Sequence, residues 1–428
     1  MRRSRWTIRR KRCARSPRSA SRCSVMASAG ARPRLVLPPR DAEPFRVNIG
    51  DDALHDLQRR LRATPMPIEP GRADWRYGPP VAYLRELTQW WANGYDWRAA
   101  EAHLNRFAQF LVPVPYPDGS TLRIHVTVEV GSNPDLPPIV LSHGWPSLPF
   151  EFFGVIDAIA HPERSGGREQ DGATVIVPSL PGFGFSDPPL QPLHAREIAV
   201  GLRTMMVESF GCDRFFAHGG DWGAVVSSWL AVDAPQVLTG LHLSMLGLRP
   251  AVVLAQPLDG DEKHWIADIQ KRLARDGGYR ETQATRPTTL GFGLADSPAF
   301  LVAWLVDKYH GWCGSSTGDL PRHSRDTMLT FASLYWFSRS LPTASWIYYA
   351  DRHGRHELAP GQRCEVPTGC SFFGKGFFPA PPTRWVERGH NLRFRQDFAD
   401  GGHFPALLKP REFVDSLRAC YRHADFAS

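Results

Sequence analysis

The segment FFAHGGDWGAVV, residues 215–226, contains the pattern on which the fold depends. An apolar run that ends at Ala217 leads into Gly219-Gly220-Asp221-Trp222-Gly223, and small apolar residues follow. This order is typical of a strand, a tight turn and a helix, with Asp221 at the tip of the turn. Glycines suit such a turn because the strand and helix backbones pass each other closely. Taken alone, the pattern leaves two interpretations open: Asp221 is a nucleophile, or it only caps the helix.

Short apolar runs on both sides of this segment predict the rest of the sheet. Wholly apolar runs at 138–142 and 173–177, and a further strand at 238–245, are separated by helical stretches such as 194–210. Apolar strands that alternate with helices predict an α/β fold with a mostly parallel sheet covered on both faces. Because ligands of such sheets bind at the carboxyl ends of the strands, we expect the chemistry just after each run.

The chain divides into four parts by composition and periodicity. We expect a basic, disordered tail, an N-terminal helical segment in which helical spacing continues from Trp97 to Leu111, a core in two pieces, and a lid rich in Trp, Gly and Pro. The boundaries are 1–43 for the tail, 44–118 for the helical segment, 119–245 and 346–428 for the core, and 246–345 for the lid.

The formal charge of +8 on 428 residues comes from the tail, since the first 40 residues hold thirteen Lys or Arg and no acid. The remainder is mildly acidic, so we expect no nucleic-acid partner. The tail fits a transit peptide loosely. A disordered arm, or sequence upstream of a start at Met26, is the favoured interpretation.

Composition also bounds the compartment and the cofactors. No apolar run approaches the roughly 20 residues of a membrane span. The seven cysteines are odd in number and form no CxxC pair, which argues against a disulfide framework or a zinc site and indicates a cytoplasmic protein. With no phosphate-binding glycine loop and no metal-spaced cluster of His or Cys, we expect neither a cofactor nor a metal.

Two further motifs favour the catalytic interpretation of Asp221. His143-Gly144-Trp145-Pro146 follows an apolar run, where α/β-hydrolases build half of an oxyanion hole, so the backbone N–H groups of Trp145 and Trp222 could bind one oxyanion. Gly401-Gly402-His403-Phe404 precedes the last helix, where that fold places its histidine base.

The motifs together resemble the epoxide hydrolases of the microsomal type and their bacterial relatives, from about Pro44 to the end of the chain. The resemblance implies the α/β-hydrolase fold with a helical lid and an N-terminal helical meander. It rests on HGWP (143–146), VPSLPGFGFSD (177–187), GGDWG (219–223), GFGLADSP (291–298), VPTG (366–369) and GGHF (401–404).

This resemblance implies a mechanism. Asp221 attacks an epoxide carbon and forms an alkyl ester, and two lid tyrosines, matched by Tyr279 and Tyr349, donate protons to the opened oxygen. Tyr348 is expected to be the core member of its pair. His403 then activates water to hydrolyse the ester.

The family pattern breaks at one position. Relatives carry an acid after the strand that leads into VPTG, and Gly376 stands in its place here. Such an acid orients the histidine and stabilises its imidazolium, and losing it can cost on the order of 10⁴ in rate. We therefore expect ester formation to survive and hydrolysis to be slowed, unless another carboxylate substitutes. The candidates are Glu365, Glu387, Asp397, Asp259 and Asp261.

Two rival functions remain open. A haloalkane dehalogenase also uses an Asp at the turn, and a catalytically weak binding protein would account for the missing acid. The favoured interpretation is hydrolysis of a small or medium-sized apolar epoxide by water, with a homo-oligomer left open.

Overall fold

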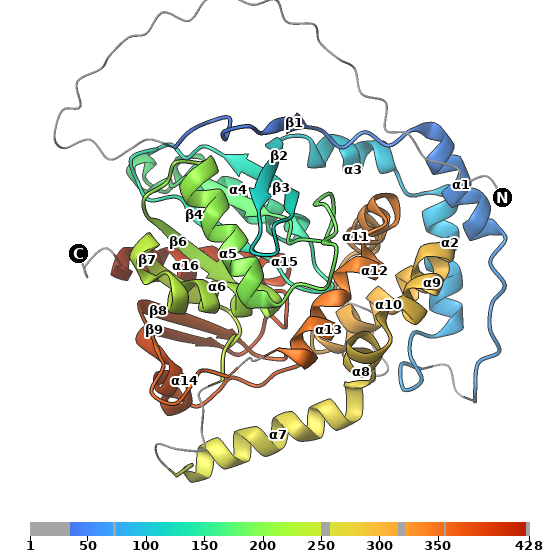
Figure 1. The fold of residues 1–428 in the computed structure, drawn as a ribbon. Helices are drawn as coiled ribbons and strands as arrows, with labels where there is room; N and C mark the ends of the chain where they lie inside the picture. The colour runs from blue at the N-terminus through green and yellow to red at the C-terminus, as the bar shows by residue number, and fades with distance from the viewer. Residues whose placement is uncertain (1–34, 72–73, 250–256, 316–321, 355–356, 425–428) are drawn as a thin grey trace, which may run out of the picture. The chain divides into compact units, whose positions relative to one another are not determined.

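The computed structural model describes residues 35–71, 74–249, 257–315, 322–354 and 357–424. Its centre is a nine-stranded sheet in the order β1-β2-β3-β5-β4-β6-β7-β8-β9 (Figure 1). The strands from β5 to β9 are parallel, whereas β1, β2 and β3 run antiparallel to their neighbours. The prediction of a mostly parallel sheet is therefore confirmed. The strands are β1 (Glu43–Phe45), β2 (Ala108–Pro115), β3 (Thr121–Glu129), β4 (Ile139–Ser142), β5 (Val175–Pro178), β6 (Phe215–Gly219), β7 (Leu238–Leu243), β8 (Cys364–Phe373) and β9 (His390–Phe398).

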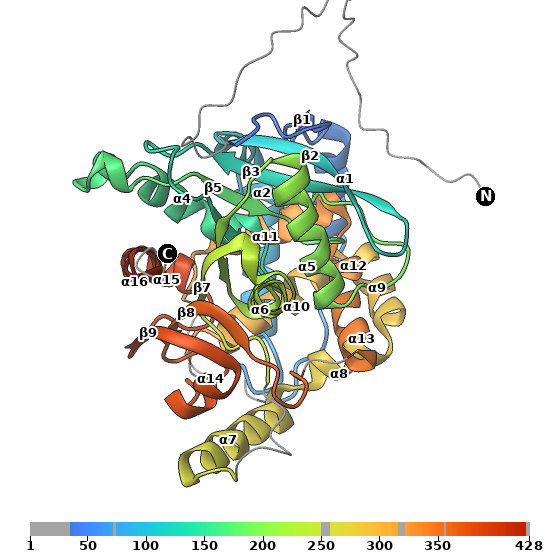
Figure 2. The same cartoon turned by 60° about the vertical axis from the view of Figure 1, so that its left-hand side comes forward.

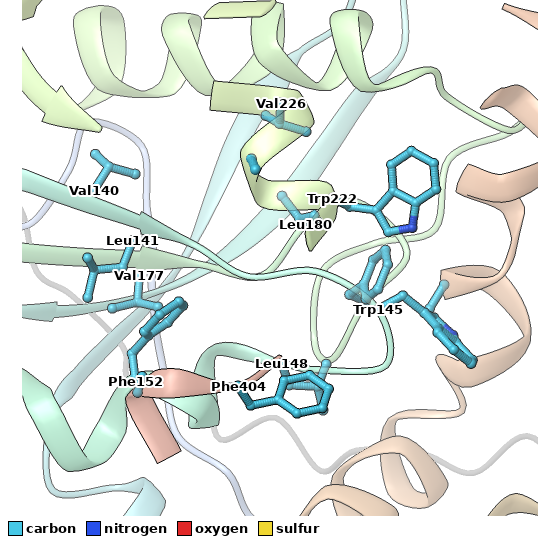
Figure 3. Packing of buried hydrophobic residues seen from close by; sticks show 14 of the residues in the cluster. Val140, Leu141, Trp145, Leu148, Phe152, Val177, Leu180, Trp222, Val226 and Phe404 are labelled. Atoms are coloured by element: carbon cyan, nitrogen blue, oxygen red, sulfur yellow. The ribbon is translucent and has the colours of Figure 1, made fainter. Parts of the chain in front are cut away.

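Helices cover both faces of the sheet, which explains why β4 and β5 are apolar throughout. One face is covered by α4 and α16, which pack together, and the other by α5 and α6 (Figures 1 and 2). Around the turn between β6 and α6, the buried core includes Val140, Val226 and Phe404 (Figure 3). The core helices are α4 (Phe153–Ala160), α5 (Ala195–Thr204), α6 (Asp221–Asp233), α14 (Thr383–Gly389), α15 (Pro405–Leu408) and α16 (Pro410–Ala424).

The N-terminal segment differs from the prediction at both ends. The predicted helix ends at Leu104, and Ala108–Pro115 form β2, because Phe110, Val112 and Val114 lie in register with β3. The ordered part of the chain begins before residue 44, where the predicted disordered tail ends. The N–H of Val36 already donates to the carbonyl of Phe210 at 2.8 Å. Residues 1–34 lie outside the described part of the chain. The helices here are α1 (Asp51–Arg62), α2 (Val81–Asn93) and α3 (Trp97–Leu104).

The lid is helical, as the resemblance implies, and extends further than predicted. Residues 346–353, expected in the core, form a helix that packs against the lid helix 278–285, so the second part of the core begins with β8. Figure 2 shows α7 beside α14, and Trp265 and Trp385 join the two helices with ring centroids 5.2 Å apart. The lid helices are α7 (Gly260–Asp276), α8 (Gly278–Thr285), α9 (Pro287–Asp296), α10 (Pro298–Gly311), α11 (Arg325–Ser338), α12 (Leu341–Ala344) and α13 (Trp346–His353).

Within the described ranges, no individual helix has the length and apolar character that crossing a membrane requires. The neighbouring helices α9 and α10 reach that length and composition only when taken together, and they are bent by 117° relative to each other.

Candidate active site

Asp221 lies at the tip of the turn between β6 and α6, in a backbone conformation that non-glycine residues rarely adopt. Its φ is 47°, in the left-handed region, and such strain is typical of a residue held in place for function. The flanking glycines are required sterically. A Cβ on Gly219 would lie 2.2 Å from the carbonyl oxygen of Gly223, and a Cβ on Gly223 would lie 2.0 Å from that of Ser142.

The two oxygens of the Asp221 carboxylate have different partners. The backbone N–H of Trp145 donates to Oδ1 at 2.8 Å, and Nε2 of His403 lies 3.2 Å from Oδ2. The backbone nitrogen of Trp222 is also close to the carboxylate. A Cβ added to Gly144 would lie 2.6 Å from that nitrogen and 2.2 Å from Oδ1 of Asp221. In the described structure, the carboxylate accepts a backbone hydrogen bond from Trp145 and not from Trp222. One oxygen is thus held in the predicted oxyanion site, and the other faces the histidine.

The lid helps to hold His403. Its backbone N–H donates to the carbonyl of Trp312 at 2.9 Å, and its ring lies edge-on to Trp312 and Phe404, with centroids 4.9 and 4.8 Å away. Gly402 has a φ of 66°, and a Cβ there would lie 2.9 Å from Cα of Cys313, so the Gly-Gly turn is needed to bring the imidazole to Asp221.

A cavity of about 610 Å³ opens above Asp221. Trp222, Tyr279 and Tyr348 line it together with Asp221. The Tyr279 ring is stacked on Trp145 at 5.3 Å, and the Tyr348 ring meets Trp222 edge-on at 5.0 Å. Burial, and to a smaller extent the charge of Asp221, hold the pKa of the Tyr279 phenol well above its usual value. Burial likewise raises the pKa of Tyr348. Both phenols are therefore neutral hydrogen-bond donors beside the carboxylate.

The structure corrects the choice between the two adjacent tyrosines of α13. The Tyr349 side chain is 38% exposed and does not line the cavity; its ring packs on that of His353 at 4.4 Å. Tyr348 is 3% exposed and faces the cavity. The reason is helical phase, because adjacent residues on a helix point in directions about 100° apart.

Gly376 does lie beside the histidine loop, where the family pattern places an acid. A Cβ on Gly376 would be 3.5 Å from the backbone N of His403, an ordinary contact distance. In the described part of the chain, no side chain forms a hydrogen bond with Nδ1 of His403.

The acids proposed as substitutes from the sequence lie elsewhere. Glu365, Glu387 and Asp261 are exposed, and Asp397 is exposed and paired with Arg395 at 2.7 Å. Asp259 caps the N-terminus of α7.

A buried acid that sequence reasoning missed lies near the site. Glu151, in the 3₁₀ turn η1 (Pro149–Phe152), is 7% exposed. The charges of both His403 and Asp221 act on its carboxyl group. A signal was present in the sequence: Glu151 follows the HGWP motif inside an otherwise apolar stretch, SLPFEFF (147–153), where an acid is unusual.

The described residues contain no group of three or more His, Cys, Asp or Glu that could hold a metal ion. The arrangement brings together a carboxylate, an imidazole, a backbone N–H at the predicted oxyanion site and two buried phenols.

Two family models match the chain. The model described as epoxide hydrolase N terminus matches residues 42–152, and the model of the alpha/beta hydrolase fold matches residues 137–336. Among curated proteins, one from Stigmatella aurantiaca (strain DW4/3-1), whose name places it among the epoxide hydrolases, is 36% identical over 89% of this chain and 84% of its own. Epoxide hydrolase 1 of Sus scrofa is 28% identical over 91% of this chain and 90% of its own.

Solved structures agree with these relatives. The Aspergillus niger epoxide hydrolase superposes with a TM-score of 0.78 at 31% identity, covering 92% of this chain and 99% of that one. The fold class and the resemblance inferred from the motifs are thus confirmed. The chain belongs to the epoxide hydrolase family and is a hydrolase of the alpha/beta hydrolase fold.

Proposed function

We propose that this enzyme converts an epoxide and water to a vicinal diol through an ester on Asp221. The observation that carries the proposal is the environment of one carboxylate. Its Oδ1 accepts from Trp145, its Oδ2 faces His403, and two buried phenols line the same cavity. A carboxylate suits an sp³ carbon electrophile, and the phenols supply the donors that the opening ring requires.

In the first half-reaction, Oδ2 of Asp221 attacks an epoxide carbon. A carbon–oxygen bond forms to Oδ2 while the ring carbon–oxygen bond breaks and its electron pair moves to the epoxide oxygen. Tyr348, with Tyr279 beside it, donates a hydrogen bond and then a proton to that oxygen. The product is a hydroxyalkyl ester on the enzyme. Tyr348 takes the role that the sequence assigned to Tyr349.

In the second half-reaction, water loses a proton to Nε2 of His403 and attacks the ester carbon of Asp221. The negative charge of the tetrahedral intermediate develops on Oδ1, which the N–H of Trp145 already contacts at 2.8 Å. Collapse breaks the bond to the alkyl oxygen, which takes the proton from His403. The carboxylic acid left on Asp221 returns its proton to the Tyr348 phenolate, and the diol leaves. The imidazolium needs stabilisation in this step, and Gly376 supplies no charge.

The cavity is suited to a substrate with an apolar body. Near Asp221 it is lined by aromatic and aliphatic side chains, including Trp222, Val225 and Phe373. Arg249 and Arg280 line it as well, and Arg280 is paired with Asp351 at 3.1 Å. Its volume of about 610 Å³ lies within the range for drug-sized ligands, which supports the small or medium-sized apolar epoxide expected from the sequence. Cytoplasmic location and homo-oligomerisation stay predictions.

A single turnover in H₂¹⁸O tests this mechanism. With enzyme in excess over styrene oxide, the heavy oxygen should enter the Asp221 carboxylate, because water attacks the ester carbon and not the epoxide. Peptide mass spectrometry locates the label, and the Asp221→Ala variant should yield neither diol nor labelled peptide. Label found only in the diol would contradict the ester mechanism.

A further inference from the structure

Glu151 is part of a buried polar cluster on the core side of the active site. The cluster consists of Ser147, Glu151, Tyr309 and Tyr335, all of them buried. The Tyr335 hydroxyl donates to the carbonyl of Ser147 at 2.9 Å. The turn η1, which carries Glu151, packs against α15, the helix that follows His403. This cluster therefore lies beneath the loop that presents the catalytic histidine.

The cluster also contacts the histidine loop through aromatic rings. Tyr309 is stacked on Phe404 with centroids 4.4 Å apart, and Phe404 lies edge-on to His403 at 4.8 Å. The Tyr309 hydroxyl is fully buried and forms no hydrogen bond within the described ranges. The charge of Glu151 and the hydroxyl of Ser147 both act on the Tyr309 hydroxyl, so the three groups share one buried polar environment.

Glu151 lacks the partner that a buried carboxylate normally has. In the part of the chain that the structure describes, it forms no ion pair with a Lys, Arg or His. Burial raises the pKa of its carboxyl to about 7, the Ser147 hydroxyl and the charge of His403 oppose that rise, and the charge of Asp221 adds to it. Burying an unpaired charge is costly unless a compensating charge forms nearby. His403 becomes cationic when it takes a proton from water, at the step for which the usual acid is absent.

We propose that Glu151 is a positioning residue for the hydrolytic half-reaction, in which it stabilises the imidazolium form of His403 in place of an acid at position 376. This role rests on the proposed ester mechanism. No bond to Glu151 forms or breaks: water transfers a proton to Nε2 of His403, and the carboxylate supplies the compensating charge while the oxyanion forms on Asp221. Ester formation does not charge His403, so it does not depend on Glu151.

The separation of the two half-reactions gives the test. Wild type and the Glu151→Gln variant are mixed rapidly with styrene oxide, quenched in acid and analysed by intact mass spectrometry. The variant should form the Asp221 ester at the wild-type rate and hydrolyse it at least about tenfold more slowly. The loss should stay below the roughly 10⁴-fold cost of removing an acid that contacts its histidine directly. The adduct should therefore accumulate. Glu169→Gln changes an exposed acid and should leave both rates unchanged.

A second substitution separates a charge effect from a packing effect. Gly376→Glu places a carboxylate beside His403, and a Cβ there meets only ordinary contacts of 3.4 to 3.5 Å. Combined with Glu151→Gln, it should restore ester hydrolysis to within a few-fold of wild type. A packing defect at Glu151 would not be repaired from position 376.

The outcomes are distinct. Unchanged hydrolysis in Glu151→Gln would overturn the proposal. So would slow hydrolysis that Gly376→Glu does not restore, provided that the Gly376→Glu single variant hydrolyses its ester normally. Absence of any Asp221 adduct in the wild type and in every variant, with diol still produced, would instead refute the ester mechanism itself.

Discussion

The two adjacent tyrosines of α13 provide the sharpest test of the proton donors. Tyr348 faces the cavity above Asp221, whereas Tyr349 is partly exposed and packs on His353. Replacing either one with Phe removes a single hydroxyl group and leaves the ring in place. The two variants are therefore matched in chemistry and differ only in the position of the lost phenol.

The magnitude follows from the number of donors in the cavity. Removing one preorganised donor to a developing oxyanion costs about 10² to 10³ in rate, or about 2.7 to 4 kcal/mol. Tyr279 remains beside the epoxide oxygen in the Tyr348→Phe variant, so we expect a loss near the lower figure, about 10²-fold in the rate of ester formation. Tyr349→Phe should change the rate by less than about twofold, because substitutions of exposed groups usually have small effects.

The assay is stopped-flow tryptophan fluorescence, because Trp222 is adjacent to Asp221 and its emission is expected to change when the ester forms. The first-order rate at saturating styrene oxide is compared for wild type, Tyr348→Phe and Tyr349→Phe, with circular dichroism to confirm folding. A larger loss in Tyr349→Phe than in Tyr348→Phe would refute the placement of the donor. The rival dehalogenase function would be favoured by a different pair of results. In that case the wild type would not turn over epoxides, and Tyr348→Phe would still release bromide from a bromoalkane.

Two further predictions follow from the same geometry. Gly144→Ala places a Cβ 2.2 Å from Oδ1 of Asp221, so the nucleophile must move; diol formation should fall at least about 10²-fold, measured by product chromatography with the thermal melting temperature as a folding control. Glu151 should make the free energy of unfolding depend on pH. Its pKa rises from 4.5 to about 7 on folding, so the native state binds more protons than the unfolded chain between these values, and stability falls as pH rises through them, by about 3 kcal/mol. Urea unfolding at pH 5 and pH 8 should show Glu151→Gln gaining stability relative to wild type by about that amount at the higher pH. The ionisable side chains that face this carboxyl (Asp221, His403 and Tyr309) remain in both proteins. The change in the stability difference between variant and wild type from pH 5 to pH 8 therefore isolates the contribution of Glu151. An equal stability difference at both pH values would contradict the raised pKa of Glu151.

The local motifs were predictable from the sequence because their geometry involves neighbouring residues. A strand, two glycines, an acid and a helix in succession define the turn that exposes Asp221, whatever the rest of the chain does. The apolar runs identified the parallel strands for a similar reason, since a strand covered on both faces must be apolar along its length. Chain order, together with the Gly-Gly turn, was enough to select His403 among sixteen histidines.

The spacing of apolar residues gave a wrong prediction where a helical pattern runs into a strand. The spacing from Trp97 to Leu111 fits a helix, but the chain turns into β2 after Leu104, because pairing with β3 satisfies its backbone and buries alternate side chains. The lid extends beyond its predicted end at residue 345 for a related reason. Helix α13 packs on α8, a contact between segments well separated in sequence.

The sequence by itself determined the fold class and the family, and it singled out Asp221 and His403 as the proposed nucleophile and base, because each depends on residues adjacent in the chain or on their order. Only the tertiary structure decided which phenol faces Asp221, since the pair Tyr348-Tyr349 is symmetric in sequence and the phase of α13 is set by its packing. Only the tertiary structure placed Glu151 beneath the loop of His403. That placement depends on how a turn after β4 packs against α15, and such packing between distant segments has no local signature.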